Sequence, residues 1–158
     1  MPHFRALLWK VARPLARLYW RVRRPLTAGV RAMVFDAEGR VLLVRHTYIA
    51  GWYLPGGGVE RGETMLTSLK RELDEEVGVL LHGVPRLAGL FANFREFKSD
   101  HVALYVLEHG VYKHVPRKSP EIAEAGFFAL AELPEAISIS TRRRIAEVVE
   151  GRAPDELW

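Results

Sequence analysis

The sequence predicts an α/β fold in which helices pack against a β-sheet. Short apolar runs typical of strands alternate along the chain with segments of helical periodicity. The chain has 158 residues, of which 49% are hydrophobic, so it has the length of one domain and enough apolar side chains for a core. We therefore expect one domain over residues 27–158, preceded by a distinct segment of residues 1–26.

The expected strands are short and nearly unbroken apolar runs, which is typical of strands covered on both faces. A turn at residues 36–39 separates the first two of them. We expect strands at residues 29–35, 41–44, 87–94, 101–107 and 126–130, with a short extended piece at 52–54.

Two helices complete the domain. The first runs from Thr64 to about Val77, because Thr64 can cap its start and Gly78 can end it. The second covers residues 141–149, with Ser140 as the expected cap. The apolar stripe of the first helix consists of Leu66, Leu69, Leu73 and Val77.

Charge divides the chain into two parts. Of the 23 basic residues, seven lie within residues 1–26, where there is no acid, and the remaining 16 stand against 19 acidic residues. The net charge of +4 therefore belongs to the N-terminal segment, whereas the domain itself is mildly acidic. Nucleic acid is for this reason an unlikely partner of the domain.

Residues 4–22 of this segment have helical periodicity, with arginines between the apolar positions and Pro14 as a kink. Three alternatives remain for its role. The segment packs against the domain or against a second subunit in a homodimer, it lies on an anionic membrane surface through Trp9 and Trp20, or it is a transit peptide. We prefer packing, and membrane contact next.

Several classes of protein are excluded by composition. The chain has no cysteine, so it has no disulfide, no thiolate zinc site and no cysteine nucleophile. No apolar run has the length of a membrane span, and Lys10 and Arg13 interrupt the only stretch that resembles a secretory signal. We expect a cytoplasmic protein.

The chemistry is predicted by three glutamates on the first helix. Glu72, Glu75 and Glu76 are spaced i, i+3 and i+4, so they share one helix face and repel one another. A hard divalent cation would remove that repulsion and bind substrate phosphates. The glycines at 56–58 come just before this helix, and such backbone amides and helix starts are natural anion sites. Taken alone, three glutamates are more often a solvated face.

The spacing of these groups closely resembles the Nudix box: glycine, five residues, glutamate, seven residues, then Arg-Glu-apolar-any-Glu-Glu-any-Gly-apolar. Every fixed position is filled. The motif covers residues 57–79, and the strands around it extend the resemblance to roughly residues 28–150. The residues that carry it are Gly57, Glu63, Arg71, Glu72, Leu73, Glu75, Glu76, Gly78 and Val79.

The resemblance implies an α/β/α sandwich with a mixed sheet and a loop–helix–loop catalytic motif. It also implies Mg²⁺- or Mn²⁺-dependent hydrolysis of a nucleoside diphosphate linked to another group, as in nucleotide sugars, ADP-ribose, dinucleotides and nucleoside triphosphates. Two alternatives are a non-catalytic nucleotide sensor and an RNA 5′-pyrophosphohydrolase. The isomerase branch of the fold is disfavoured, because it resembles enzymes that need a catalytic cysteine.

Roles follow residue by residue from the same resemblance. Glu72, Glu75 and Glu76 match the metal-binding and base positions, with Glu72 preferred as the base, Glu75 as its alternative and Glu76 as the principal ligand. Arg71 orients the glutamates. The remaining expectations are the Gly56 carbonyl as a metal ligand, Glu63 as a brace between loop and helix, Gly57 and Gly78 as structural glycines, and Glu108 or Glu121 as a further carboxylate.

Four residues before the glycine run are candidates for substrate binding. Arg45 could contact phosphate, His46 could act as an acid or base, and Tyr48 or Trp52 could stack on a base. The alternative for the aromatic residues is packing under the loop, and for His46 a structural hydrogen bond.

Overall fold

The computed structural model describes residues 26–94 and 99–158. The expectations for the N-terminal segment, including a homodimer or a membrane contact through it, concern residues 1–26 and thus lie almost wholly outside the described part. Within that part, no helix combines the length and the apolar character needed to cross a membrane.

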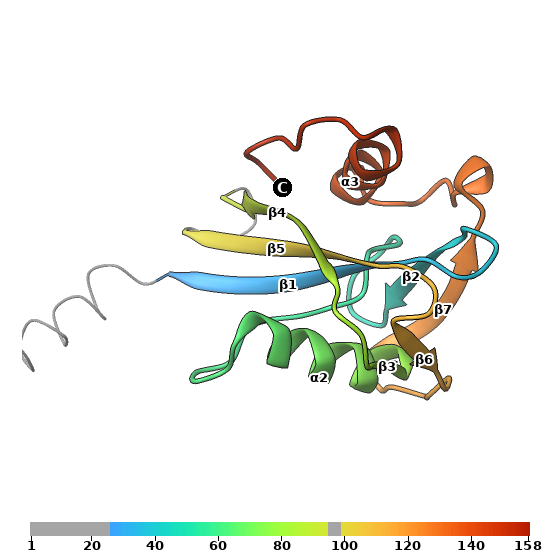
Figure 1. The fold of residues 1–158 in the computed structure, drawn as a ribbon, viewed down its shortest axis with the longest axis horizontal. Helices are drawn as coiled ribbons and strands as arrows, with labels where there is room; N and C mark the ends of the chain where they lie inside the picture. The colour runs from blue at the N-terminus through green and yellow to red at the C-terminus, as the bar shows by residue number, and fades with distance from the viewer. Residues whose placement is uncertain (1–25, 95–98) are drawn as a thin grey trace, which may run out of the picture.

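A mixed three-stranded sheet forms the centre of the molecule. Its strands are β1 (Thr27–Val34), β5 (Asp100–Leu107) and β4 (Arg86–Ala92), in the order β1-β5-β4. β1 and β5 are parallel, and β4 runs antiparallel to β5 with a bulge between Leu87 and Gly89. Figure 1 shows β4 at one edge of this sheet.

Two strand pairs flank the central sheet. β2 (Val41–His46) pairs antiparallel with β7 (Ile122–Phe128), and β3 (Val79–Leu81) pairs antiparallel with β6 (Tyr112–His114). The prediction of a strand at residues 126–130 was partly wrong: the strand begins four residues earlier, and a short 3₁₀ helix, η1 (Leu130–Glu132), follows it. β3 and β6 were not predicted, because three residues are too few to show a period.

The two helices lie on opposite sides of the sheet (Figure 1). α2 (Met65–Val77) packs Leu69, Leu73 and Val77 against the even-numbered residues of β1. On the other side, Ile145 of α3 (Ile139–Glu150) belongs to the same core cluster as Met33 of β1. The alternation of β1 side chains between two cores makes the architecture a layered sandwich.

Both helices have the expected kind of cap, but one starts earlier than predicted. Thr64 caps α2 by accepting the Thr67 N–H, and Gly78 ends the helix in the left-handed conformation. Ser138, rather than Ser140, caps α3 by accepting the Thr141 N–H at 3.1 Å. Leu66 is 38% exposed, so the predicted apolar stripe of α2 was one residue too long.

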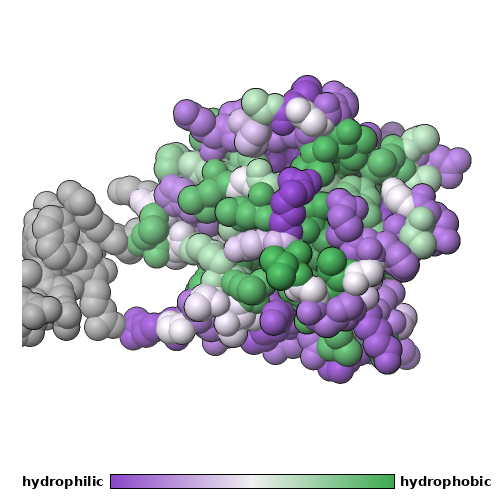
Figure 2. Space-filling model, viewed as in Figure 1, coloured by the Kyte–Doolittle hydropathy of each residue, from purple (hydrophilic) through white to green (hydrophobic). Residues whose placement is uncertain are grey.

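Apolar surface gathers over β4 on the face that Figure 2 shows. Leu87 and Leu90 of this edge strand are 55% and 60% exposed. β4 is an edge strand that pairs with β5, and its bulge lies between Leu87 and Gly89.

Candidate active site

The glycine run lies against β1 and serves as the floor of the site. Val30 and Ala32 of β1 donate their backbone N–H groups to the carbonyls of Gly57 and Pro55, both at 2.9 Å. Gly56 has a φ of +130°, and a Cβ atom at this position would overlap the Val30 carbonyl. The loop can therefore approach β1 this closely only because position 56 is glycine.

The three glutamates of α2 lie in very different surroundings, although they share a helix face. The exposed fraction of the side chain is 6% for Glu76, 15% for Glu72 and 62% for Glu75. The carboxylate of Glu72 lies against Gly57, where a Cβ atom would overlap it. Glu76 and Glu72 thus reach the glycine loop, and Glu75 does not.

Glu76 is a buried carboxylate tied to the loop. One of its oxygens accepts the Gly56 N–H at 2.7 Å. The pKa of Glu76 is raised to about 7, chiefly by burial and to a smaller extent by the charges of Glu72 and Glu121, against the lowering effects of the Gly56 N–H and of Arg31. The negative charge at this position is therefore poorly compensated within the protein.

Arg71 braces the loop against the helix. Its guanidinium donates to both carboxylate oxygens of Glu63, at 2.9 and 3.0 Å, and to Glu72 at 2.7 Å. The hydrogen bonds from Arg71 lower the pKa of Glu63 to about 2. Glu75 lies 3.5 Å from the same guanidinium, and Arg71 also donates to the Gly58 carbonyl. The Arg71–Glu63 pair thus ties the loop to the helix, while the role of Arg71 in orienting the glutamates stays a prediction.

Arg31 is a site residue that the sequence analysis missed. It projects from β1 and donates to the Gly56 carbonyl, the group expected to bind metal. Its charge also lowers the pKa values of Glu76 and His46. One signal was available, because Arg31 is the only charged residue in the apolar run 29–35.

The fold places Glu121 and Glu108, the two candidates for a further carboxylate ligand, in different parts of the molecule. Glu121 is exposed in the turn before β7, and its charge raises the pKa of Glu76, so it lies close to the site. Glu108 follows β5 and lines a different hollow with Phe35 and Asp36. The structure therefore brings Glu121, and not Glu108, to the glutamates of α2.

His46 and Tyr48 lie beside the glutamates. His46 is buried, its Nδ1 atom is 4.0 Å from the Glu76 carboxylate, and burial lowers its pKa, so no ion pair forms between them at neutral pH. Tyr48 is 70% exposed as a residue, and the centroid of its ring is 5.1 Å from that of His46. Burial of the hydroxyl, followed by the charges of Glu121 and Glu76, raises the pKa of Tyr48.

Arg45 and Trp52 lie outside this group. Arg45 pairs with Glu124 across β2 and β7 at 2.8 Å, on the exposed surface. Trp52 packs edge-on against Phe128, with 4.8 Å between the ring centroids, in the core on the α3 side. The packing alternative for Trp52 therefore agrees with the structure better than stacking on a substrate.

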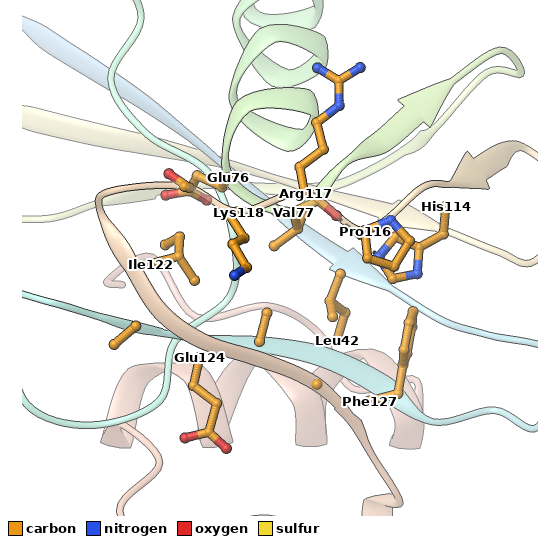
Figure 3. Close-up of a pocket in the computed structure, with 14 residues that line it drawn as sticks. Leu42, Glu76, Val77, His114, Pro116, Arg117, Lys118, Ile122, Glu124 and Phe127 are labelled. Atoms are coloured by element: carbon orange, nitrogen blue, oxygen red, sulfur yellow. Dashed lines mark hydrogen bonds between the residues drawn. The ribbon is translucent and has the colours of Figure 1, made fainter.

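A cavity of about 400 Å³ opens beside Glu76, between the end of α2 and the strand pair β2 and β7. Figure 3 shows the Lys118 ammonium directed into it, whereas the Arg117 side chain turns away and pairs with Asp74 at 3.1 Å. Its floor is apolar and includes Leu42 and Phe127. The Glu76 side chain thus contacts the glycine loop and also lines this cavity.

Glu72, Glu76 and the Gly56 carbonyl fit a hard divalent cation in their donor chemistry, since all three offer oxygen atoms. In the described part of the chain, however, no three carboxylates or imidazoles stand close enough to form a metal site as they are. Arg71 holds Glu72, and Arg31 holds the Gly56 carbonyl. The poorly compensated charge of Glu76 is the observation that favours a cation here.

Comparison with known proteins gives consistent matches. A family model described as the NUDIX domain matches residues 25–148. A MutT-like protein of Streptomyces ambofaciens is 27% identical over 128 residues, which cover 81% of this chain and 80% of that protein. An RNA pyrophosphohydrolase of Psychrobacter cryohalolentis is 34% identical over 85 residues, 54% of this chain and 47% of that protein. The chain spans about half the length of such RNA pyrophosphohydrolases.

The fold has close counterparts among solved structures. The crystal structure of a MutT NUDIX hydrolase from Burkholderia pseudomallei superposes with a TM-score of 0.66 at 25% identity, covering 79% of this chain and 99% of that one. This likeness confirms the expected α/β/α sandwich with a mixed sheet.

Proposed function

Since the chain belongs to the NUDIX family, whose domain covers residues 25–148, we propose that it hydrolyses a pyrophosphate bond in a nucleoside diphosphate linked to another group. The observation that carries this proposal is the buried carboxylate of Glu76, held against the glycine loop beside Glu72 and Glu121. A sensor that only binds nucleotides has no need for such a concentration of charge, which costs stability.

NUDIX hydrolases generally use divalent metal ions, and we propose Mg²⁺ or Mn²⁺ for this protein. Glu76, Glu72 and Glu121 would hold the ion together with the carbonyl of Gly56. When bound, such a cation lowers the pKa of a water molecule and neutralises charge on the leaving phosphate. The four groups proposed as ligands are all oxygen donors, which suits these two ions better than softer metals.

The protein groups have separate roles in this proposal. Glu72 is the general base, because it lies at the loop, whereas Glu75 is largely exposed and farther from it. Arg71 orients Glu72 through a hydrogen bond of 2.7 Å. Tyr48 is an exposed residue beside His46 and within the electrostatic influence of Glu76 and Glu121, and we propose that it contacts the substrate.

The test is hydrolysis of a panel of nucleoside diphosphate derivatives with Mg²⁺, with Mn²⁺ and with a chelator. We expect cleavage that the chelator abolishes. The Glu76→Gln variant keeps the shape of the side chain but loses its charge, so its kcat should fall by about 100-fold or more. Full turnover by Glu76→Gln would refute the proposal, and nucleotide binding without any cleavage would favour the sensor.

A second candidate is hydrolysis at the 5′ end of RNA, because relatives of 34% identity bear the name RNA pyrophosphohydrolase. Seven basic residues at positions 1–26 agree with a polyanionic substrate. Cleavage of 5′-triphosphorylated RNA should then fall steeply with salt, while cleavage of free nucleotides should not. Equal salt dependence of the two reactions would exclude this candidate.

A further inference from the structure

A diphosphate bridge carries a group at each end, so an enzyme that cuts it needs space for both groups. Two cavities adjoin the proposed active-site residues, and they share no lining residue. One, of about 260 Å³, is lined by Arg31, Asp100 and Trp158 and adjoins Gly57. The other, of about 400 Å³, is the cavity beside Glu76. A role of this larger cavity in substrate binding rests on the proposed function.

The loop of residues 115–121 forms one side of the larger cavity and is tied down at both ends. The Val115 N–H donates to the Gly78 carbonyl at 2.8 Å, directly after α2. At the other end, the Thr47 N–H donates to the Glu121 carbonyl at 2.9 Å, directly after β2. The side chains that this loop contributes to the cavity are therefore carried by an anchored backbone.

Two of the charged side chains around the cavity are engaged elsewhere. Arg117 pairs with Asp74 of α2 at 3.1 Å, and Glu124 pairs with Arg45 of β2 at 2.8 Å. Figure 3 shows the charged groups of Arg117 and Glu124 directed away from the cavity. These two charges are satisfied by the protein itself.

Lys118 is the remaining cation around the cavity. Its ammonium is directed into the cavity (Figure 3), and it pairs with no carboxylate among the residues that the structure describes, neither with Glu76 nor with Glu124. An ammonium has three N–H donors and no acceptor, so the group that matches it best is an anionic oxygen. The cavity thus offers an unpaired cation to a ligand that enters it.

The floor of the cavity is apolar. Leu42 of β2 and Phe127 of β7 are paired across the two strands and lie on the side that faces Val77 of α2. The Phe127 ring also meets His114 edge-on, with 5.6 Å between the centroids. The volume of about 400 Å³ lies within the range of about 300–1,000 Å³ that is usual for small-molecule pockets. The cavity therefore suits a compact carbon skeleton with one charged substituent at Lys118.

We propose that this cavity binds the second group of the substrate, beyond the diphosphate bridge, and that Lys118 selects second groups that carry a further phosphate. Glu76 marks the end of the cavity nearest the bridge, because the Gly56 N–H holds it at the glycine loop. Lys118 forms no ion pair with Glu76, so its charge meets a substituent of the second group rather than the bridge. The substrate class is a nucleoside diphosphate linked to a phosphorylated sugar.

Binding of the second group alone tests the proposal without turnover. The probes are ribose 1,5-bisphosphate and ribose 5-phosphate, which differ by one phosphate, and their binding to the full chain is measured by calorimetry in the presence of a chelator. We expect the bisphosphate to bind about fivefold more tightly, which is the scale of one exposed ion pair, and the preference to shrink as salt is added. Equal binding of the two probes overturns the proposal and leaves Lys118 as a solvated lysine.

Matched variants separate the cavity from the overall charge of the protein. Lys118→Met keeps the length of the side chain but loses its charge, so the two affinities should become equal, whereas Lys118→Arg should retain most of the preference. Lys113→Met is the control, because it removes an exposed cation of the neighbouring β6 that does not line the cavity. Lys113 and Lys118 are both exposed, so the variants should melt at the Tm of the parent protein.

An unchanged preference in Lys118→Met, or an equal loss of preference in Lys113→Met, overturns the proposal.

Hydrolysis separates this inference from the proposed function. With Mg²⁺ or Mn²⁺, ADP-ribose 1″-phosphate should have a KM about fivefold below that of ADP-ribose at a similar kcat, and Lys118→Met should remove the difference. Cleavage of both compounds with equal KM would overturn the role of Lys118 and leave the hydrolase intact. Preferential binding of the bisphosphate without cleavage of any nucleoside diphosphate derivative would support the cavity and refute the hydrolase.

Discussion

Two arginine-centred clusters, one on each helix, make an informative contrast. Arg71 on α2 faces three carboxylates, those of Glu63, Glu72 and Glu75, at 2.7–3.5 Å. Arg144 on α3 is fully buried, pairs with the single carboxylate of Glu147 at 2.5 Å and donates to the Leu157 carbonyl. It also lies 4.2 Å from the centroid of the Phe91 ring.

The difference lies in the balance of charge. The Arg144 guanidinium meets the carboxylate of Glu147, a carbonyl and an aromatic face, so its charge is paired within the protein. Around Arg71 carboxylates outnumber the cation, and the buried Glu76 nearby adds another. A structural cluster is balanced by its own chain, whereas the α2 cluster has an excess of negative charge that a bound cation would balance.

The largest effect on stability is expected at the balanced cluster. Arg144→Met leaves Glu147 buried and unpaired, so the free energy of unfolding should fall by about 3–5 kcal/mol in chemical denaturation. The double variant Arg144→Met/Glu147→Leu removes both charges and should recover most of that loss. A loss below about 1 kcal/mol in the single variant would show that the ion pair is not structural.

The unbalanced cluster should make stability depend on pH. Below pH 4.5 Glu76 is protonated in both the folded and the unfolded chain, and as pH rises to about 7 only the unfolded chain releases this proton readily. The protein should therefore lose about 1–3 kcal/mol over this range relative to Glu76→Gln. Parallel pH profiles of the two proteins would contradict this expectation.

Metal should reverse that loss. Because a cation binds the charged form of Glu76, saturating Mg²⁺ at pH 8 should raise the Tm of the parent protein, and a chelator should lower it again. Glu76→Gln should show little response. An equal rise in both proteins would mean that the ion binds elsewhere.

A smaller effect is expected when the Arg71 guanidinium, which donates to two carboxylates at once, is replaced. Arg71→Lys keeps the charge but cannot bind Glu63 and Glu72 at once, so kcat should fall by about tenfold while the free energy of unfolding changes by less than about 1 kcal/mol. Arg152→Lys is the matched control, since Arg152 is exposed and pairs with Glu150 on the surface. Unchanged kcat in Arg71→Lys would mean that Arg71 does not orient Glu72.

The smallest effect is expected at Arg45. Its pair with Glu124 is exposed on both sides, so Arg45→Ala should change the free energy of unfolding by less than about 1 kcal/mol. The KM for a nucleotide substrate separates the two alternatives for this residue. A marked rise in KM would show that Arg45 leaves Glu124 to bind phosphate, as the sequence pattern first indicated.

Local signals explain which parts of the fold were predictable. The limits of α2 follow from Thr64 and Gly78, which act on backbone groups only a few residues away. The central strands were recognised as apolar runs, apart from their ends. β3 and β6 escaped because each becomes a strand only by pairing with the other, more than thirty residues away.

The sequence by itself determined the family, the helix with its glutamates and the bracing pair of Glu63 and Arg71, since all of these lie within one continuous motif. Only the tertiary structure decided that Glu76 is buried and Glu75 exposed, that Glu121 and not Glu108 lies near them, and that Arg31, Asp100 and Trp158 surround one cavity. Helical spacing specifies the direction of a side chain, but the depth of its burial depends on the distant segments that cover it.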